Sequence, residues 1–271
     1  MKLSFIGGGN MATALIRGLL QRGYPAADIR AAEISADARK RLEQEFAIEA
    51  HADYAGVVRG ADYVVLAVKP QQMREVTREL SRHLDRHTVI SIAAGVRCRD
   101  LARWLSGYEN ILRVMPNTPA LVHSGITALY ALPQVSEERK SAAEEILRAV
   151  GETFWVQDEA QLDAVTALSG SGPGYVFYFM EALERAAVEL GFTPEMARRL
   201  TVQTFLGSTR LAEQSVDSLA TLRARVTSKG GTTERAIKTF DAAAVRLSIV
   251  QAVHAACERS KELGDELGRA G

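Results

Sequence analysis

Two glycine-rich segments hold residues whose types and spacing could do chemistry. The first, GGGNMA at residues 7–12, follows the apolar run KLSFI and precedes ATALIRGLL, which has a helical pattern. A strand, a G-x-G-x-x-A turn and a helix are typical of dinucleotide binding. Gly7 permits the tight turn, Gly9 lets a pyrophosphate approach the backbone, and Ala12 lets the helix pack closely on the strand. The alternative is a plain glycine turn without a ligand.

The second segment is TSKGGTT at residues 227–233, whose last two residues begin the predicted helix TTERAIKTF. It is not a phosphate-binding P-loop, because Lys229 precedes the glycines instead of following them. Gly230 and Gly231 could expose backbone amides at the start of the helix, which suits a small carboxylate. A helix cap without a ligand is the alternative.

An acid at the end of the second predicted strand bears on the choice of coenzyme. Glu33 ends the run IRAAE, where a carboxylate would accept a hydrogen bond from the adenosine ribose. This position favours NAD, since a 2′-phosphate would be repelled unless Arg39 or Lys40 reached across to it. A solvated acid at a strand end is the alternative.

Three further loops follow predicted strands at their carboxyl ends, where open α/β sheets bind ligands. Lys69 and Pro70 follow YVVLAV, and the run AAG at residues 93–95 follows TVISI. Proline and small residues there would let a nicotinamide lie close to the backbone, although simple turns are the alternative. MPNTPA at residues 115–120 follows ILRV and offers a rigid loop with polar side chains.

The segment from Asp158 to Glu184 contains no lysine, arginine or histidine. An enzyme that oxidises an alcohol usually needs such a group near the hydride to take the hydroxyl proton. A cyclic imine is less demanding, because its nitrogen can arrive already protonated. The segment therefore favours reduction of an imine in a site lined by hydroxyls and backbone.

The elements that must position these residues fall into two predicted domains. Residues 1–157 alternate short β-rich runs with helix-length segments, which indicates βαβ units and a parallel sheet. After FWV at residues 154–156 the strand signals stop, and residues 158–271 show helical spacing. We expect an α/β chain with an N-terminal Rossmann-like doubly wound sheet and an all-α C-terminal domain. The apolar run YVFYF at residues 175–179 exceeds what a small bundle need bury, which indicates a homo-oligomer.

Composition excludes several classes of protein. The 271 residues are 47% hydrophobic and 24% charged, as in globular proteins, and Lys+Arg and Asp+Glu are both 33. No overall positive field attracts nucleic acid or a membrane surface, so neither is an expected partner. No apolar run is long enough for a signal or a membrane span, so we expect a cytoplasmic protein. His83 and His87 stand four residues apart, but the helix between them has ended and no metal site is expected.

Six blocks along the chain resemble pyrroline-5-carboxylate reductases. They are FIGGGNMA, LAVKPQ, SIAAGV, RVMPNTPA, VTALSGSGP and VTSKGGTTE, in order between residues 5 and 234. The resemblance implies a Rossmann domain, a helical domain that dimerises by interleaving with its partner, and hydride transfer from NADPH or NADH to 1-pyrroline-5-carboxylate, giving L-proline. It makes residues 1–157 the dinucleotide-binding domain and residues 158–271 the domain that binds substrate and dimerises.

The resemblance, together with the strand-end position of Glu33, where many relatives carry no acid, gives the expected site residues. The coenzyme would be held by residues of the turn, of the second strand and of the loops after the later strands: Gly7, Gly8, Gly9, Asn10, Met11, Glu33, Ala67, Val68, Lys69, Pro70, Ala93, Ala94, Gly95 and Asn117. The substrate carboxylate would be held by Ser228, Gly230, Gly231, Thr232 and Thr233. Thr233 would be the catalytic residue, with its hydroxyl near the ring nitrogen.

The chain departs from the family pattern in two loops. Lys229 stands where proline is usual, and Gly174 where alanine is usual. Both changes affect the rigidity of a loop more than its chemistry.

Two rival functions fit parts of the chain. A β-hydroxyacid dehydrogenase expects a lysine on the interdomain helix, which residues 158–184 lack, and a non-catalytic NAD(P)-sensing protein would leave TSKGGTT and SGSGP without a role.

Overall fold

The structure, a computed structural model, describes residues 1–269 and divides into two compact units. Unit 1 comprises Met1–Ser171 together with the chain from Ala256 onward, and unit 2 comprises Gly172–Ala255. The boundary expected at residue 157 therefore lies inside unit 1, because the segment after the last strand packs on the sheet before the chain leaves it. The final helix contributes its second half to unit 1 as well.

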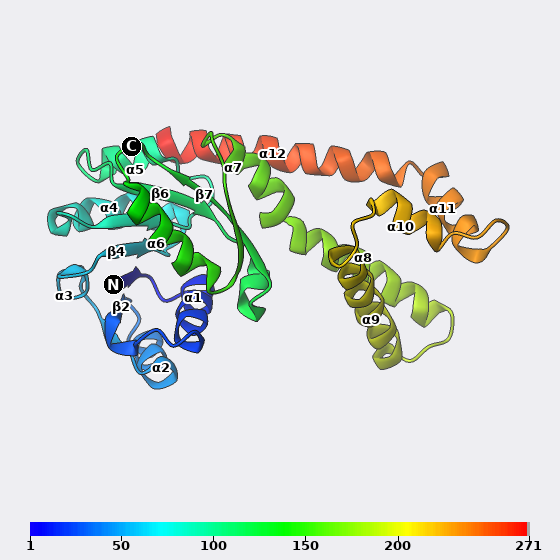
Figure 1. Cartoon of the computed structure of the whole chain (residues 1–271), viewed down its shortest axis with the longest axis horizontal. Helices are drawn as coiled ribbons and strands as arrows, with labels where there is room; N and C mark the ends of the chain where they lie inside the picture. The colour runs from blue at the N-terminus through cyan, green and yellow to red at the C-terminus, as the bar shows by residue number, and fades with distance from the viewer. Residues whose placement is uncertain (270–271) are drawn as a thin grey trace. The chain divides into compact units, whose positions relative to one another are not determined.

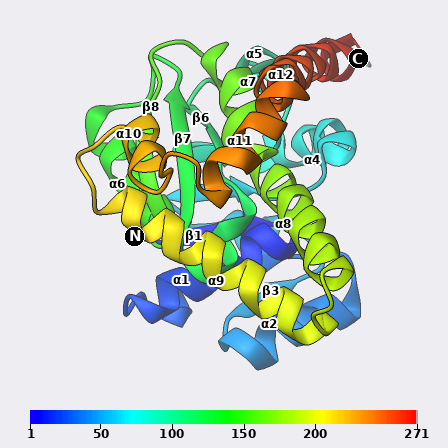
Figure 2. The ribbon, with the colours of Figure 1, turned by 90° about the vertical axis from the view of Figure 1, so that its right-hand side faces the viewer.

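Unit 1 is built on one eight-stranded sheet, ordered β3-β2-β1-β4-β5-β6-β7-β8 (Figure 1). Its strands are β1 (Leu3–Ile6), β2 (Ile29–Ala32), β3 (Glu49–His51), β4 (Tyr63–Leu66), β5 (Thr88–Ser91), β6 (Ile111–Met115), β7 (Gly125–Ala131) and β8 (Gly151–Trp155). Every neighbouring pair is parallel except β6 and β7. Figure 2 shows β6, β7 and β8 side by side.

Helices cover both faces of the sheet, as a doubly wound fold requires. One apolar core joins the sheet to α1 (Asn10–Gln21), α2 (Ala36–Phe46) and α6 (Glu137–Arg148). The other joins it to α3 (Tyr54–Val58), α4 (Met73–Leu80) and α5 (Cys98–Trp104). The run YVVL of β4 is buried on both faces, which explains its lack of polar alternation. The expected Rossmann-like fold class is confirmed.

Two strands were not anticipated from the sequence. The strand β3 has three residues, and only one of them, Ala50, is apolar. The strand β7 reads GITALYA, whose alanines and leucine fit a helix as readily as a strand. Its antiparallel pairing with β6 follows from the short connection between them, which cannot make a parallel crossover.

A buried ion pair ties β6 to the end of the sheet domain. Arg113 of β6 is 3% exposed, and its Nη1 lies 2.9 Å from Oε1 of Glu159. The same carboxylate oxygen accepts a 2.7 Å hydrogen bond from the backbone N–H of Cys98 at the start of α5. Glu159 therefore holds a strand and a helix together from the segment that precedes α7 (Gln161–Val165).

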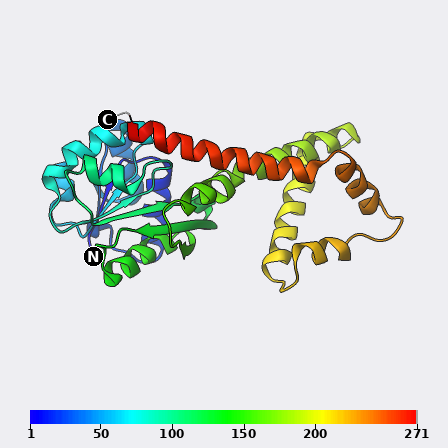
Figure 3. The same cartoon turned by 90° about the horizontal axis from the view of Figure 1, so that it is seen from above.

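Unit 2 contains only helices: α8 (Gly172–Glu189), α9 (Pro194–Glu213), α10 (Leu219–Arg225), α11 (Thr232–Ala242) and the first half of α12 (Val245–Arg269). The expectation that Gly174 lies in a loop is wrong, because it lies in the first turn of α8. Ala197 and Thr201 are its only buried residues. Figure 3 shows α8 to α11 spread as an open frame rather than a closed bundle. Large apolar side chains are left exposed, among them Phe177 at 64% and Leu211 at 67%. None of the helices described up to residue 269 is long and apolar enough to cross a membrane.

Candidate active site

The glycine turn after β1 is shaped by close backbone contacts. Gly7 has φ +102°, and a Cβ on it would lie 2.8 Å from the carbonyl oxygen of Ala67. Only glycine fits this conformation and this approach to the end of β4. Gly9 is different, because a Cβ there would meet no protein atom within 4 Å. The open space beside Gly9 lies at the start of α1, where no side chain caps the helix, so its first amides are available to an anion.

A cavity of about 310 Å³ opens beside this turn. Its lining includes half of the expected coenzyme residues: Gly7, Gly8, Gly9, Glu33, Ala67, Val68 and Lys69. Asn10 and Met11 continue from the turn into α1, and Pro70 follows Lys69. The cavity also takes in Ile34, Tyr54, Gln72 and Val76, which the sequence reasoning missed. Tyr54 begins α3 after the unanticipated strand β3, so no sequence signal pointed to it. Burial raises the pKa of its phenol.

Glu33 contacts the turn through hydrogen bonds to the backbone. Its Oε2 accepts from the N–H of Gly8 at 2.9 Å, and its Oε1 accepts from the N–H of Ser35 at 3.0 Å. Arg39 donates a hydrogen bond to the backbone carbonyl of Glu33 at 2.7 Å, so its guanidinium lies near the acid. Arg39 is the residue that the sequence analysis names as a possible partner of a 2′-phosphate. The carboxylate thus joins the glycine turn to the chain that follows β2.

The AAG loop follows the next strand of the sheet. Ala93, Ala94 and Gly95 leave the carboxyl end of β5, which pairs in parallel with β4. Gly95 has φ +75°, a left-handed conformation that glycine adopts without strain. Because β4 and β5 end at the same edge, this loop lies beside Ala67 to Lys69, although it does not line the 310 Å³ cavity itself.

Asn117 connects the loop after β6 to a π-helical turn at Thr166–Gly170. It is 9% exposed, and its side-chain amide donates to the carbonyl of Ser169 at 3.2 Å while its Oδ1 accepts from the N–H of Ile126 at 3.0 Å. A Cβ on Gly170 would lie 2.5 Å from Cε of Met115, so the turn packs directly on the end of β6. Asn117 therefore fixes the loop geometry at this edge of the sheet.

The residues expected to bind substrate lie together in unit 2, at the start of α11. Both glycine amides already have acceptors, one in α11 and one in the loop. Gly230 donates to Oε2 of Glu234 at 2.9 Å, and Gly231 donates to the carbonyl of Ser228 at 3.0 Å. The hydrogen bond from Gly230, with that from Lys238, lowers the pKa of Glu234. No side chain caps α11, so the amides of Thr232 and Thr233 are the better candidates for a carboxylate.

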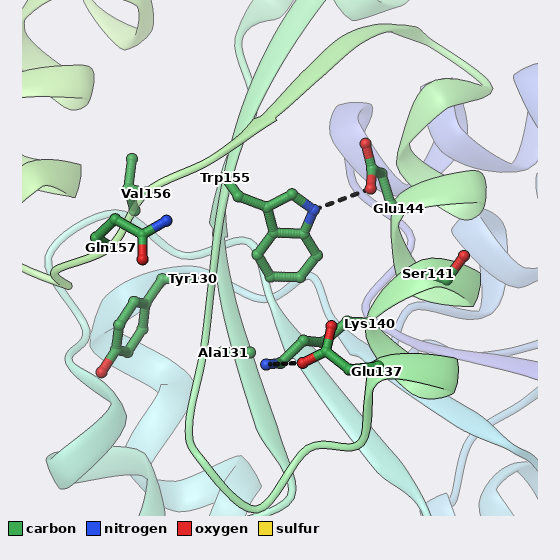
Figure 4. Close-up of a pocket in the computed structure, with 9 residues that line it drawn as sticks. All are labelled: Tyr130, Ala131, Glu137, Lys140, Ser141, Glu144, Trp155, Val156 and Gln157. Carbon is green, nitrogen blue, oxygen red and sulfur yellow. Dashed lines mark hydrogen bonds and ion pairs between the residues drawn. The ribbon is translucent and has the colours of Figure 1, made fainter.

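A second cavity in unit 1, of about 420 Å³, is not part of this site. Figure 4 shows it between Tyr130, Trp155 and the helix α6, with Lys140 and Glu137 paired at its edge. Because β7 runs antiparallel to β6, the ends of β7 and β8 lie at the opposite edge of the sheet from the glycine turn. The hydrogen bond from Trp155, with those from Thr153 and Arg148, lowers the pKa of Glu144.

The fold and the glycine cavity define a nicotinamide-dependent oxidoreductase with a separate helical unit. Family comparison agrees for both parts: residues 2–95 match "NADP oxidoreductase coenzyme F420-dependent", and residues 159–263 match "Pyrroline-5-carboxylate reductase dimerisation". The pyrroline-5-carboxylate reductase of Pseudomonas aeruginosa is 47% identical over 99% of this chain and 98% of its own length. The chain belongs to the pyrroline-5-carboxylate reductase family.

Solved structures of pyrroline-5-carboxylate reductases are also similar to this chain over nearly its whole length. The pyrroline-5-carboxylate reductase of Coxiella burnetii superposes with a TM-score of 0.90 at 43% identity, covering 97% of this chain and 98% of that one. The Plasmodium falciparum enzyme, solved with NADP bound, gives 0.88 at 28% identity with the same coverage. The helical unit thus matches a dimerisation domain, which agrees with the apolar side chains that unit 2 leaves exposed and supports homo-oligomerisation.

The contrast between Gly7 and Gly9 generates a prediction. Gly9→Ala should leave the free energy of unfolding nearly unchanged, because its Cβ meets open space. It should weaken binding of NADH and NADPH at least tenfold, because the methyl group would enter the space expected for the pyrophosphate. Gly7→Ala should destabilise the fold by about 1–3 kcal/mol through strain and overpacking. Urea unfolding and coenzyme titration of both variants measure this. Unaltered coenzyme binding in folded Gly9→Ala would contradict it.

Proposed function

We propose that this protein reduces 1-pyrroline-5-carboxylate to L-proline, with hydride from NADH or NADPH. The observation that supports this most directly is similarity over the whole chain to named reductases, in both the coenzyme unit and the helical unit. The proposal includes a cytoplasmic location, as expected from the sequence. When bound, the coenzyme supplies the hydride.

The protein's own residues would bind and orient the coenzyme and the substrate. The uncapped start of α1 and the open face of Gly9 suit a pyrophosphate, while the loops after β4, β5 and β6 would border the nicotinamide. Asn117 and the π-helical turn would keep that border rigid. The stretch from Asp158 to Glu184 offers no basic side chain, which fits a substrate whose nitrogen arrives protonated.

The carboxylate of the substrate would be held at the start of α11. The amides of Thr232 and Thr233 and the hydroxyl of Ser228 provide donors to an anion, and the helix dipole favours negative charge there. Thr232 is exposed, whereas Thr233 is half-buried and so better placed to present its hydroxyl to one defined group.

The test is loss of NADH or NADPH absorbance with pyrroline-5-carboxylate as acceptor, and recovery of L-proline as the product. A folded protein that binds coenzyme but reduces the imine with neither one would refute the proposed reaction. Oxidation of a β-hydroxyacid with NAD+ or NADP+, followed as a gain of NADH or NADPH absorbance, would favour the rival dehydrogenase.

Thr233 is proposed to donate a hydrogen bond to the ring nitrogen. The protonated iminium nitrogen has no lone pair to accept a hydrogen bond, but it regains one as hydride adds to the carbon, so this bond forms as the product is approached. Thr233→Val keeps the shape and removes the donor. Loss of about 1–3 kcal/mol predicts a fall of about 5- to 150-fold in kcat/KM, with coenzyme affinity nearly unchanged. Thr232→Val is the matched control and should lose less. Equal losses in both variants would remove Thr233 from this role.

Glu33 is proposed to set coenzyme preference. Its carboxylate would accept from a ribose 2′-hydroxyl and repel a 2′-phosphate, so Glu33→Ser should move the ratio of kcat/KM values toward NADPH by about 1–3 kcal/mol. The ratio matters because loss of the bond to Gly8 weakens binding of both coenzymes equally. Glu43→Ser, on the exposed surface of α2, controls for charge. If the ratio of kcat/KM values does not change, Glu33 has no role in coenzyme preference and serves only to bind the backbone of Gly8 and Ser35.

The oligomer is proposed to be a dimer, or a multiple of it, through the helical unit. Exposed side chains such as Phe177, Tyr178 and Leu211 need an apolar partner. Sedimentation at micromolar protein should show at least twice the 29.5 kDa of the chain. Phe177→Glu should shift the distribution toward smaller species, whereas Arg185→Glu, at a charged position of the same helix, should not. A monomer in the unaltered protein would refute the proposal.

A further inference from the structure

The second half of α12 packs on unit 1 through a face of small residues. Ser260, Gly264 and Gly268 recur every four positions, so they lie on one face of the helix. Ser260 Oγ donates to Oδ1 of the buried Asp163 at 2.7 Å. A Cβ on Gly264 would lie 3.0 Å from Nε of Arg97, and one on Gly268 would lie 2.8 Å from Oδ2 of Asp100. The helix therefore approaches the chain from Arg97 to Asp100 too closely to carry larger side chains.

Arg97 is the centre of this contact. Its Nη1 lies 2.6 Å from Oδ1 of Asp265, and its Nη2 donates to the carbonyl of Lys261 at 3.1 Å. The Arg97 side chain is 20% exposed, so the ion pair is partly shielded from solvent. The bond from Arg97 lowers the pKa of Asp265, which keeps the carboxylate charged. Arg103 adds a 2.7 Å hydrogen bond to the carbonyl of Gly268.

The same end of α12 also contacts the AAG loop. A Cβ on Gly95 would lie 3.3 Å from Cδ1 of Leu267 and 3.6 Å from the backbone nitrogen of Gly264. On its other side the loop is attached to the sheet, where Ile92 donates to the carbonyl of Leu66 at 3.3 Å. The loop from Ala93 to Arg97 is therefore held between the edge of the sheet and the final helix.

We infer that Arg97 and Asp265 are positioning residues for the coenzyme. Their ion pair fixes the end of α12 against the AAG loop, and so keeps Ala93, Ala94 and Gly95 in the shape that receives the nicotinamide half. Neither side chain lines the glycine cavity, so they act through the loop and not by contact. This inference rests on the proposed coenzyme role of the AAG loop, but not on the identity of the substrate.

The test compares coenzyme affinity among charge-matched variants of α12. Asp265→Asn should raise the Kd of NADH and NADPH three- to tenfold and raise the KM for coenzyme equally, with kcat within twofold. Asp265→Glu keeps the carboxylate and should restore most of the affinity. Glu266→Gln is the control, because it removes a charge at the next residue, whose partner Arg259 lies on the same helix. Its coenzyme Kd should match that of the unaltered protein.

Gly264→Ala tests the contact without changing charge. Its methyl group would lie 3.0 Å from Arg97, so it should move the guanidinium and raise the coenzyme Kd as Asp265→Asn does. Circular dichroism and thermal unfolding establish that each variant is folded at the titration temperature. The inference is overturned if both variants lower the unfolding temperature but bind coenzyme like the Glu266→Gln control. That result would make the contact structural only.

Different results would refute the proposed reaction and the inferred role of Arg97 and Asp265. If the unaltered protein binds coenzyme but does not reduce pyrroline-5-carboxylate, the proposed reaction is wrong and the titrations still decide this inference. If the unaltered protein binds neither coenzyme, both are wrong.

Discussion

The structure depends on how the chain leaves β1. This strand is central, and it is hydrogen-bonded to β2 on one side and β4 on the other, so the chain must turn out of the sheet directly after Ile6. At Gly7 the turn passes so close to Ala67 that no side chain fits. As a result, α1 begins at the carboxyl edge of the sheet, near the end of β4, and no side chain caps its first amides. The neighbouring strands then need only end at the same edge for their loops to share one site.

Polar groups inside unit 1 hold its elements in register where apolar packing cannot. Glu159 binds both Arg113 and the N–H of Cys98. Asn117 donates to the carbonyl of Ser169 and accepts from the N–H of Ile126, so its amide joins two segments of the chain. Burying such groups without partners would be costly, so each one specifies a single arrangement of the segments that it joins. These contacts surround the segment from residue 157 to 171 and explain why it belongs with the sheet.

The sequence was informative where local chemistry is unambiguous. The turn at residues 7–9 and the buried runs of β1, β4 and β5 could be predicted because glycine spacing and uninterrupted apolar strands have few other meanings. The short β3 and the alanine-rich β7 could not, since tertiary pairing decides their conformation. In the site, the loops after the strands were predictable, whereas Tyr54 and the bonds that occupy the amides of Gly230 and Gly231 depend on neighbours in three dimensions. No periodicity could show that the last helix returns to pack on unit 1.

The sparse interior of unit 2 has a consequence for the energetics of the protein. An 84-residue segment with two buried residues removes too little apolar surface from water to offset the loss of chain entropy on folding. Its helices must gain the rest of their stability from contacts between subunits, so association contributes directly to the free energy of folding. Stability then becomes a function of dilution, and the temperature of unfolding is expected to rise with protein concentration.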